Sequence, residues 1–295
     1  MRKLALLLAL VALPFTARAA STINATNAYA WGANIGWTNW LPSPANGVVI
    51  GEFICSGYIY GANVGWINVG NGNPVNHIRY LNNSATDFGV NYQIDPTQPG
   101  FAILRGYAYG ANIGWINFEN AGNPRVSLFT GTLTGYAYSA NCGWINLNDA
   151  LGKVQTDHIA MGVDSDGDGI ADAFEYQYFG NLTTANASSD ADHDGISDKD
   201  EYLDGTSPII STDRLRITAF ATNSAGTSSP ITWTSTTARL YVIETKPDLL
   251  QVTWDLDPIF GTPFAPDAGT TTMRTATAST ATKRVYRVRS IRPVP

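Results

Sequence analysis

The chain has little charge and few of the residues that usually carry catalysis. Only 14% of its 295 residues are charged, and it contains 3 histidines. With 18 basic against 24 acidic residues it lacks the basic excess of a nucleic-acid-binding protein. His77, His158 and His193 have no metalloprotease spacing, and the sequence contains no nucleophile elbow or phosphate loop. We therefore predict that the chain is not an enzyme, with a secreted glycan-active hydrolase that uses scattered carboxylates as the alternative.

Long apolar runs are also scarce. After the N-terminus, no run approaches the roughly 20 apolar residues of a membrane-spanning helix. At the N-terminus, Arg2 and Lys3 precede an apolar segment at 4–13 and the small-x-small sequence at 17–19, which is typical of a signal peptide. We predict that residues 1–19 are cleaved and that the mature chain, which has no membrane span, is secreted or lies at the cell surface.

Cysteine is limited to Cys55 and Cys142. An even number of cysteines in an exported chain permits a disulfide. However, Cys142 occupies a repeat position that holds Ile35, Val64 or Ile113 in the other copies described next, so a small buried apolar residue is the other interpretation.

Glycine, asparagine and aromatic residues are abundant and form a repeat. A thirteen-residue pattern occurs at 28–40, 57–69, 106–118 and 135–147. Three copies read Gly-Tyr-x-Tyr-(Gly/Ser)-Ala-Asn-x-Gly-Trp-Ile-Asn followed by an apolar residue. The shared tryptophans are 29, 49 and 29 residues apart, which indicates that the copies are grouped in two pairs.

Each repeat predicts a β-hairpin. Aromatic residues alternate on either side of a turn whose glycines and asparagine tolerate positive φ. A single hairpin is marginal in water, so the four are expected to bury a common core. The sequence thus predicts a mainly β protein whose first part, residues 21–162, is an all-β domain of repeated hairpins.

The recurring aromatic side chains allow two interpretations. They could fill the core between hairpins, or they could stack on the sugar rings of an extracellular polysaccharide or cell-surface component. The candidate ligand-binding residues are Tyr58, Tyr60, Trp66, Tyr107, Tyr109, Trp115, Tyr136, Tyr138 and Trp144.

Residues 209–295 read as a second β domain. Short alternating segments are expected at 215–221, 231–234, 240–244, 252–256, 270–276 and 283–291, separated by turn residues. This pattern predicts a C-terminal sandwich of the immunoglobulin or fibronectin type III kind, with Trp233 and Trp254 in its core.

Between the two β domains, residues 163–208 form a short acidic connector with expected helical turns. It holds 12 of the 24 acidic residues, all between Asp164 and Asp204. Two twelve-residue loops, 164–175 and 190–201, carry carboxylates at positions 1, 3, 5, 9 and 12 and glycine at position 6. Counting the backbone carbonyl of position 7, the candidate ligands are Asp164, Asp166, Asp168, Ile170, Asp172, Glu175, Asp190, Asp192, Asp194, Ile196, Asp198 and Glu201.

This spacing predicts about two bound Ca²⁺ ions. Calcium accepts six to eight oxygen ligands, and such a loop wraps the ion when alternate side chains converge and position 12 closes the site. Magnesium prefers a tighter octahedron, and zinc would need nitrogen or sulfur ligands.

The connector resembles bacterial thrombospondin type 3 repeats, which are kin to EF-hand-like dockerin loops. The resemblance is carried by Asp-Ser-Asp-Gly-Asp-Gly-Ile-Ala-Asp-Ala-Phe-Glu, by Asp-Ala-Asp-His-Asp-Gly-Ile-Ser-Asp-Lys-Asp-Glu, and by the following Gly-Thr-Ser-Pro at 205–208. It implies a calcium-rigidified extracellular spacer. The expected function is therefore that of a secreted structural or adhesive protein, with carbohydrate binding through the repeat aromatics as the alternative.

Overall fold

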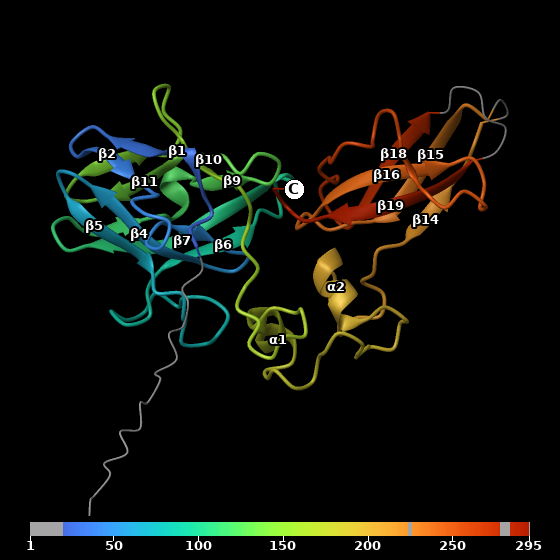
Figure 1. Ribbon diagram of the computed structural model, residues 1–295, viewed down its shortest axis with the longest axis horizontal. Helices are drawn as coiled ribbons and strands as arrows, with labels where there is room; N and C mark the ends of the chain where they lie inside the picture. Colours follow the sequence, from blue (N-terminus) through green and yellow to red (C-terminus); the bar gives the residue numbers. More distant parts are fainter. Residues whose placement is uncertain (1–19, 224–225, 278–283, 295) are drawn as a thin grey trace, which may run out of the picture.

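The computed structural model describes residues 20–223, 226–277 and 284–294. The expected signal peptide, residues 1–19, lies outside the described residues. The prediction of a mainly β protein is confirmed: the described chain forms antiparallel sheets and two short α-helices (Figure 1). Within the described residues, neither helix has the length and apolarity needed to cross a membrane.

The repeat region forms four β-hairpins and several supporting strands. The hairpins are β1 (Ile23–Gly32) with β2 (Gly36–Asn39), β4 (Cys55–Gly61) with β5 (Gly65–Gly70), β7 (Phe101–Gly110) with β8 (Gly114–Asn117), and β11 (Tyr136–Ser139) with β12 (Gly143–Asn146). The supporting strands are β3 (Val49–Ile50), β6 (Val90–Ile94), β9 (Arg125–Ser127), β10 (Leu133–Thr134) and β13 (Val154–Thr156), with a 3-10 helix at Asn120–Gly122.

The four hairpins pair side by side into a closed ring of eight strands. β2 pairs with β4, β5 with β7, β8 with β11, and β12 returns to pair with β1. The register is equivalent at every junction: Asn39 lies opposite Tyr60, Asn68 opposite Tyr109, Asn117 opposite Tyr138, and Asn146 opposite Trp31. Closure leaves none of these eight strands as a free sheet edge.

The turn asparagines link the hairpin tips around the ring. Each one donates a hydrogen bond from Nδ2 to a carbonyl oxygen of the preceding hairpin's turn, over 3.0–3.1 Å. The four bonds run from Asn63 to Ile35, from Asn112 to Val64, from Asn141 to Ile113, and from Asn34 to Cys142. The chain spacing of the tryptophans suggests two pairs, but in space the four hairpins occupy equivalent places.

The hairpin strands contribute small and aliphatic side chains to the inside of the ring, and Trp40 and Phe118, just beyond β2 and β8, join the same core. The inward residues of the hairpin strands include Ala30, Ile67, Ala108 and Ile145, all 4% exposed or less. Cys55 and Cys142 are both free and buried, so they form no disulfide. Burial raises the pKa of the Cys55 thiol to about 12, so this side chain behaves as a small apolar residue.

The connector folds into two loop-and-helix units. α1 (Asp172–Tyr178) and α2 (Asp198–Asp204) each begin at position 9 of an acidic loop. Ile170, Phe174 and Tyr202 form a small core with Ala171 and Ala185. The buried residues of this core all come from the connector, and Phe53 of the hairpin region packs against them.

The C-terminal part consists of two three-stranded antiparallel sheets. One contains β14 (Ile217–Phe220), β15 (Ser228–Thr234) and β18 (Thr271–Thr277); the other contains β16 (Leu240–Lys246), β17 (Asp255–Leu256) and β19 (Val285–Ile291). Trp233 and Ile243 pack between the sheets, in agreement with the expected core position of Trp233. Trp254 is instead a half-buried surface residue, because Lys246 and Arg287 lie over its ring.

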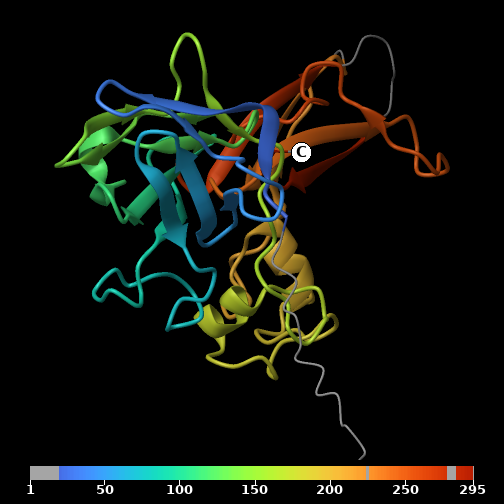
Figure 2. The same cartoon turned by 60° about the vertical axis from the view of Figure 1, so that its left-hand side comes forward.

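The three parts contact one another directly. In Figures 1 and 2, α1 and α2 lie below the two β parts, while the C-terminal end returns to the hairpin ring. The Val294 amide donates to the Leu128 carbonyl oxygen at 2.6 Å, and Arg292 forms an ion pair with Glu52. The connector therefore does not hold the β parts apart, as the resemblance to a spacer implied, but joins two parts that touch.

Candidate metal centres

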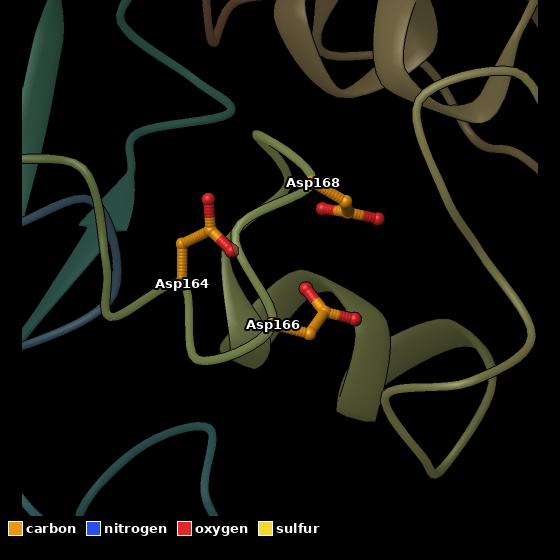
Figure 3. Close-up of side chains that lie close together, drawn as sticks. All are labelled: Asp164, Asp166 and Asp168. Carbon is orange, nitrogen blue, oxygen red and sulfur yellow. The ribbon is translucent and has the colours of Figure 1, made fainter.

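Three carboxylates of the first acidic loop converge. Oxygens of Asp164, Asp166 and Asp168 lie within 4.8 Å of one another, and Figure 3 shows the three side chains on the inner side of the loop ahead of α1. Asp164 shapes the loop because its two oxygens accept hydrogen bonds from the backbone N–H groups of Gly167 and Gly169, at 2.7 and 2.9 Å. The alternating spacing thus produces the convergence that a hard cation needs.

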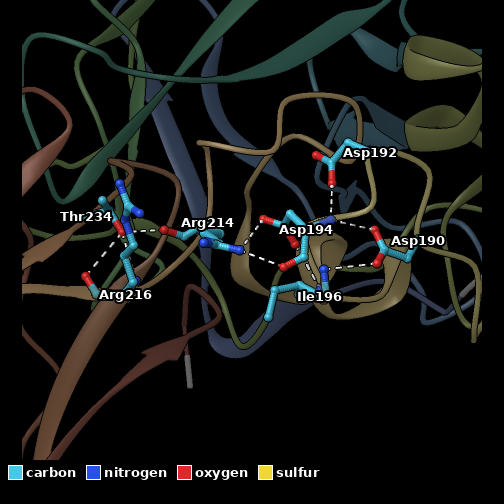
Figure 4. A network of polar contacts seen from close by, with 8 residues as sticks. Asp190, Asp192, Asp194, Ile196, Arg214, Arg216 and Thr234 are labelled. Carbon is cyan, nitrogen blue, oxygen red and sulfur yellow. Dashed lines mark hydrogen bonds and ion pairs between the residues drawn. The ribbon is translucent and has the colours of Figure 1, made fainter.

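The second loop repeats the same arrangement. Oxygens of Asp190, Asp192 and Asp194 also lie within 4.8 Å of one another. Asp190 accepts from the backbone N–H groups of Asp194 and Gly195, at 3.2 and 3.0 Å (Figure 4). The two loops therefore form two similar candidate sites.

Glycine at position 6 is required by the backbone. Gly169 and Gly195 have φ values of +91° and +92°, which side chains with a Cβ rarely adopt. At Gly195 no atom lies within 4 Å of where a Cβ would be, so the need for glycine there is purely conformational.

The carboxylates at position 9 brace the loops. Asp172 accepts hydrogen bonds from the backbone N–H and the hydroxyl of Ser165, and Asp198 accepts from Ala191 and Ser189. With both oxygens of each engaged, contact with a cation through a water molecule suits Asp172 and Asp198 better than direct ligation.

Position 12 of each loop holds a carboxylate that nothing neutralises. Glu175 and Glu201 are each 0% exposed, and none of their four oxygens has a hydrogen-bond partner among the described residues. Asp168, Asp192 and Asp194 contribute three more buried oxygens without a hydrogen bond, so the loops hold seven of the fifteen such side-chain atoms in the described chain. Burying an unpaired charge costs several kcal/mol, which a bound cation would offset.

Without a positive charge nearby, the pKa values of the two position-12 glutamates are raised. Burial first, and then the neighbouring carboxylates led by Asp168, raise the pKa of Glu175 to about 7. Burial and the charges led by Asp192 raise the pKa of Glu201 to about 8. The residues present therefore fit a divalent cation with oxygen ligands, and a cation would restore the ionised form.

The position-7 residues differ between the loops. The Ile170 side chain is fully buried in the connector core, whereas Ile196 is half-buried and faces a hollow between α2 and β19. The two side chains thus have different surroundings, although their backbone carbonyls hold equivalent positions in the two loops.

Two basic side chains that sequence analysis did not single out contact the loops: Lys199 joins the second loop to the first, and Arg214 joins the C-terminal part to the second loop. Lys199 of the second loop donates from Nζ to the Asp168 carbonyl oxygen of the first, at 2.8 Å. Arg214, just before the C-terminal sheets, donates from Nη1 to the Asp194 carbonyl oxygen at 2.6 Å and lies 3.4 Å from Asp194 Oδ2 (Figure 4). In both loops, the backbone carbonyl oxygen of position 5 therefore accepts a hydrogen bond from a basic side chain outside that loop. Neither contact has a local sequence signature.

The nine repeat aromatics lie on the outside of the hairpin ring. None belongs to the hydrophobic core of the described repeat region, so the interpretation that they fill it is wrong. Tyr58 and Tyr107 are half-buried and the other seven are exposed. Trp66, Trp115 and Trp144 each contact two tyrosines at 4.8–6.2 Å between ring centroids.

The first repeat has outward rings that the candidate set omitted. Tyr29, Trp31 and Trp37 occupy the same register and are also exposed. The alignment of residues 28–40 with the other copies was sufficient to identify them.

No protein-family model matches the chain, and neither does any curated protein or solved structure.

Proposed function

We propose that this chain is a secreted calcium-binding structural protein in which two Ca²⁺ ions stabilise the joint between two β domains. The observation that carries the proposal is the pair of fully buried, unpartnered carboxylates Glu175 and Glu201. Each closes a loop whose aspartates converge within 4.8 Å, and oxygen ligands of this number suit calcium. The residues that would hold the ions are the aspartates at positions 1, 3 and 5, the carbonyl of position 7 and the glutamate at position 12.

The surroundings of α2 support a role at the joint. Tyr202 directly follows Glu201, and its hydroxyl donates to Glu52 of the hairpin domain at 2.7 Å. Its backbone carbonyl oxygen accepts a hydrogen bond from Arg239 of the C-terminal domain at 2.6 Å. Arg292 of the C-terminal domain also pairs with Glu52. A cation bound by Glu201 would therefore fix the position of Tyr202, which contacts both β domains.

Calcium would supply positive charge where the loops have an excess of negative charge. Without it, carboxylate repulsion opposes the folded loops; with it, the ligands become cross-links. A role of this kind is structural and needs no catalytic residue. The signal-peptide pattern at 1–19 supports export, and outside the cell loops of this kind bind calcium with dissociation constants on the order of 10⁻⁴–10⁻³ M.

The test compares wild-type protein with the Glu175→Gln/Glu201→Gln double variant by calcium calorimetry and thermal unfolding. We expect two ions per wild-type chain and strongly reduced uptake in the double variant. In calcium-free buffer the double variant should be at least as stable as wild type, because glutamine removes two buried unpaired charges. Calcium should then stabilise the wild type alone.

Asp200→Asn is the matched control. Asp200 is an exposed carboxylate of the second loop at position 11, next to Glu201, and it is not a candidate ligand. Its loss should leave calcium uptake within about two-fold of wild type, since exposed charges contribute little. Unchanged uptake in the glutamine double variant, or no uptake by the wild type, would contradict the proposal.

A further inference from the structure

A hollow lies beside the third hairpin, on the outside of the ring. It encloses about 430 Å³ and is lined by Asn82, Asn83, Ser84, Phe88, Tyr107 and Trp115. This volume falls within the range of about 300–1,000 Å³ typical of small-ligand pockets. Its walls come from two segments, the hairpin β7–β8 and the loop that precedes β6.

Aromatic rings form one side of the hollow. Trp115 is 46% exposed, and Phe88 packs against it at 5.0 Å between centroids and an angle of 87°. Tyr107 and Tyr109 also meet the indole at steep angles of 78° and 60°. None of these three rings stacks parallel to the indole, and 46% of the Trp115 surface stays exposed to a ligand.

Neutral polar side chains from the loop before β6 also line the hollow. Asn82 is held in place, because its Oδ1 accepts from the Gly89 N–H at 3.0 Å and its Nδ2 donates to the Tyr80 carbonyl oxygen. Asp87 secures the same loop by accepting hydrogen bonds from the N–H groups of Val75 and Leu81. The Asn83 side chain, by contrast, is exposed and makes no hydrogen bond within the described residues. The loop is therefore preorganised and presents one uncommitted amide.

We propose that this hollow binds a neutral oligosaccharide, with the Trp115 ring stacked on a sugar and the Asn83 amide hydrogen-bonded to its hydroxyl groups. A sugar ring has an apolar C–H face and a rim of hydroxyls, and so matches a hollow lined by both aromatic rings and neutral amides. No lining residue is charged, which disfavours anionic chains and charged peptides. The proposal goes beyond the calcium role and depends on the hairpin ring alone.

The repeat supplies an internal control. Trp66 is the equivalent residue of the second hairpin, 51% exposed, and it contacts Tyr58 and Tyr60 at 6.1 and 5.1 Å. It therefore has the equivalent pair of tyrosines around it, but among the described residues it has no counterpart of Phe88, and it does not line the hollow. Comparing substitutions of the two tryptophans distinguishes saccharide binding in the hollow from saccharide binding to any exposed tryptophan.

The experiment titrates the full, calcium-loaded chain with neutral hexasaccharides of glucose, xylose or mannose, followed by calorimetry and tryptophan fluorescence. A hexauronate and a proline-rich peptide are the comparison probes. We expect saturable binding of at least one neutral hexasaccharide. Trp115→Ala should weaken it about 30-fold, as for a central aromatic anchor. Asn83→Ala should weaken it about 3- to 10-fold, and Trp66→Ala should leave it within two-fold.

Several outcomes would overturn the proposal. These are no binding of any neutral hexasaccharide at millimolar concentration, binding of the hexauronate or the peptide alone, or equal losses for Trp66→Ala and Trp115→Ala. If Trp115→Ala does not fold, the exposed Asn83→Ala substitution carries the test. The Glu175→Gln/Glu201→Gln variant should still bind saccharide, so failure of either proposal can be told from failure of the other.

Discussion

The Nδ2 of Asn34 donates a hydrogen bond to the carbonyl oxygen of Cys142 over 3.1 Å, although 108 residues separate them. This contact joins the tip of the first hairpin to that of the fourth. Three equivalent contacts join the remaining tips, so Asn34 completes a circle rather than ending a row. The repeat domain is thereby closed at its tips as well as along its strands.

Asn34→Ala should therefore destabilise the repeat domain as much as the same change at Asn63, Asn112 or Asn141. Each variant loses one hydrogen bond, worth about 0.5–1.5 kcal/mol of unfolding free energy. Urea unfolding of the four single variants measures this. In an open row of hairpins the Asn34 variant alone would be neutral, and that result would contradict closure.

The hairpins and the acidic loops could be predicted because their signals are local. Alternation, glycine at the turns and the carboxylate spacing all act within about a dozen residues. The face on which the aromatics lie could not be predicted, because both faces of these strands carry apolar residues. The structure shows the reason: a closed ring of eight short strands takes Ala30 and Ala108 between its strands, so the aromatics of those strands stay outside, and only Trp40 and Phe118, just beyond β2 and β8, are buried rings of the described repeats.

The contact between the hairpin ring and the C-terminal part had no local signal either. Glu52 and Arg292 are 240 residues apart, and neither stands in a repeat or a motif. Ion pairs of this kind depend on where the folded domains meet.

The Tyr202 hydroxyl should stabilise the joint. Tyr202→Phe removes its hydrogen bond to the Glu52 carboxylate, at 2.7 Å, without removing the ring. Because the acceptor is charged and half-buried, we expect a loss of about 1.5–3 kcal/mol of unfolding free energy in calcium. Tyr176→Phe is the control, since the Tyr176 ring stacks on His77 but its hydroxyl makes no hydrogen bond within the described residues. If Tyr202→Phe and Tyr176→Phe lost equal unfolding free energy, the hydrogen bond to Glu52 would not account for the effect.

Gly195 should be needed for calcium affinity at the second loop. With φ at +92° and open space around the missing Cβ, Gly195→Ala introduces backbone strain of about 1–2 kcal/mol and no clash. Calcium binding at this loop should weaken about 5- to 30-fold, measured by calorimetry. Gly195→Asn should lose less, because asparagine tolerates positive φ better than alanine. Equal calcium affinities of the Gly195→Ala variant and the wild type would contradict this prediction.

Glu244 should make the C-terminal domain sensitive to acid. Burial opposes its ionisation, but hydrogen bonds from Arg287 and Arg289 outweigh this and hold the pKa of Glu244 below its usual range. Because the folded pKa is lowered, the stabilisation is fully present above the unfolded value of about 4.3 and is lost as the pH falls through the folded value. Both arginines are about half exposed, so solvent screening keeps the effect modest.

Glu244→Gln should therefore flatten the loss of stability on acidification below about pH 5 while leaving its slope near neutral pH unchanged. Urea unfolding of wild type and variant at pH 3, 5 and 7, followed by the summed fluorescence of the eight tryptophans, measures the difference. Repeating the series in 1 M salt, where the Debye length is about 3 Å, should shrink the gap between the two proteins only in part, since the Glu244 carboxylate is buried. Parallel curves at all three pH values would show that the ion pairs with Arg287 and Arg289 do not form in solution.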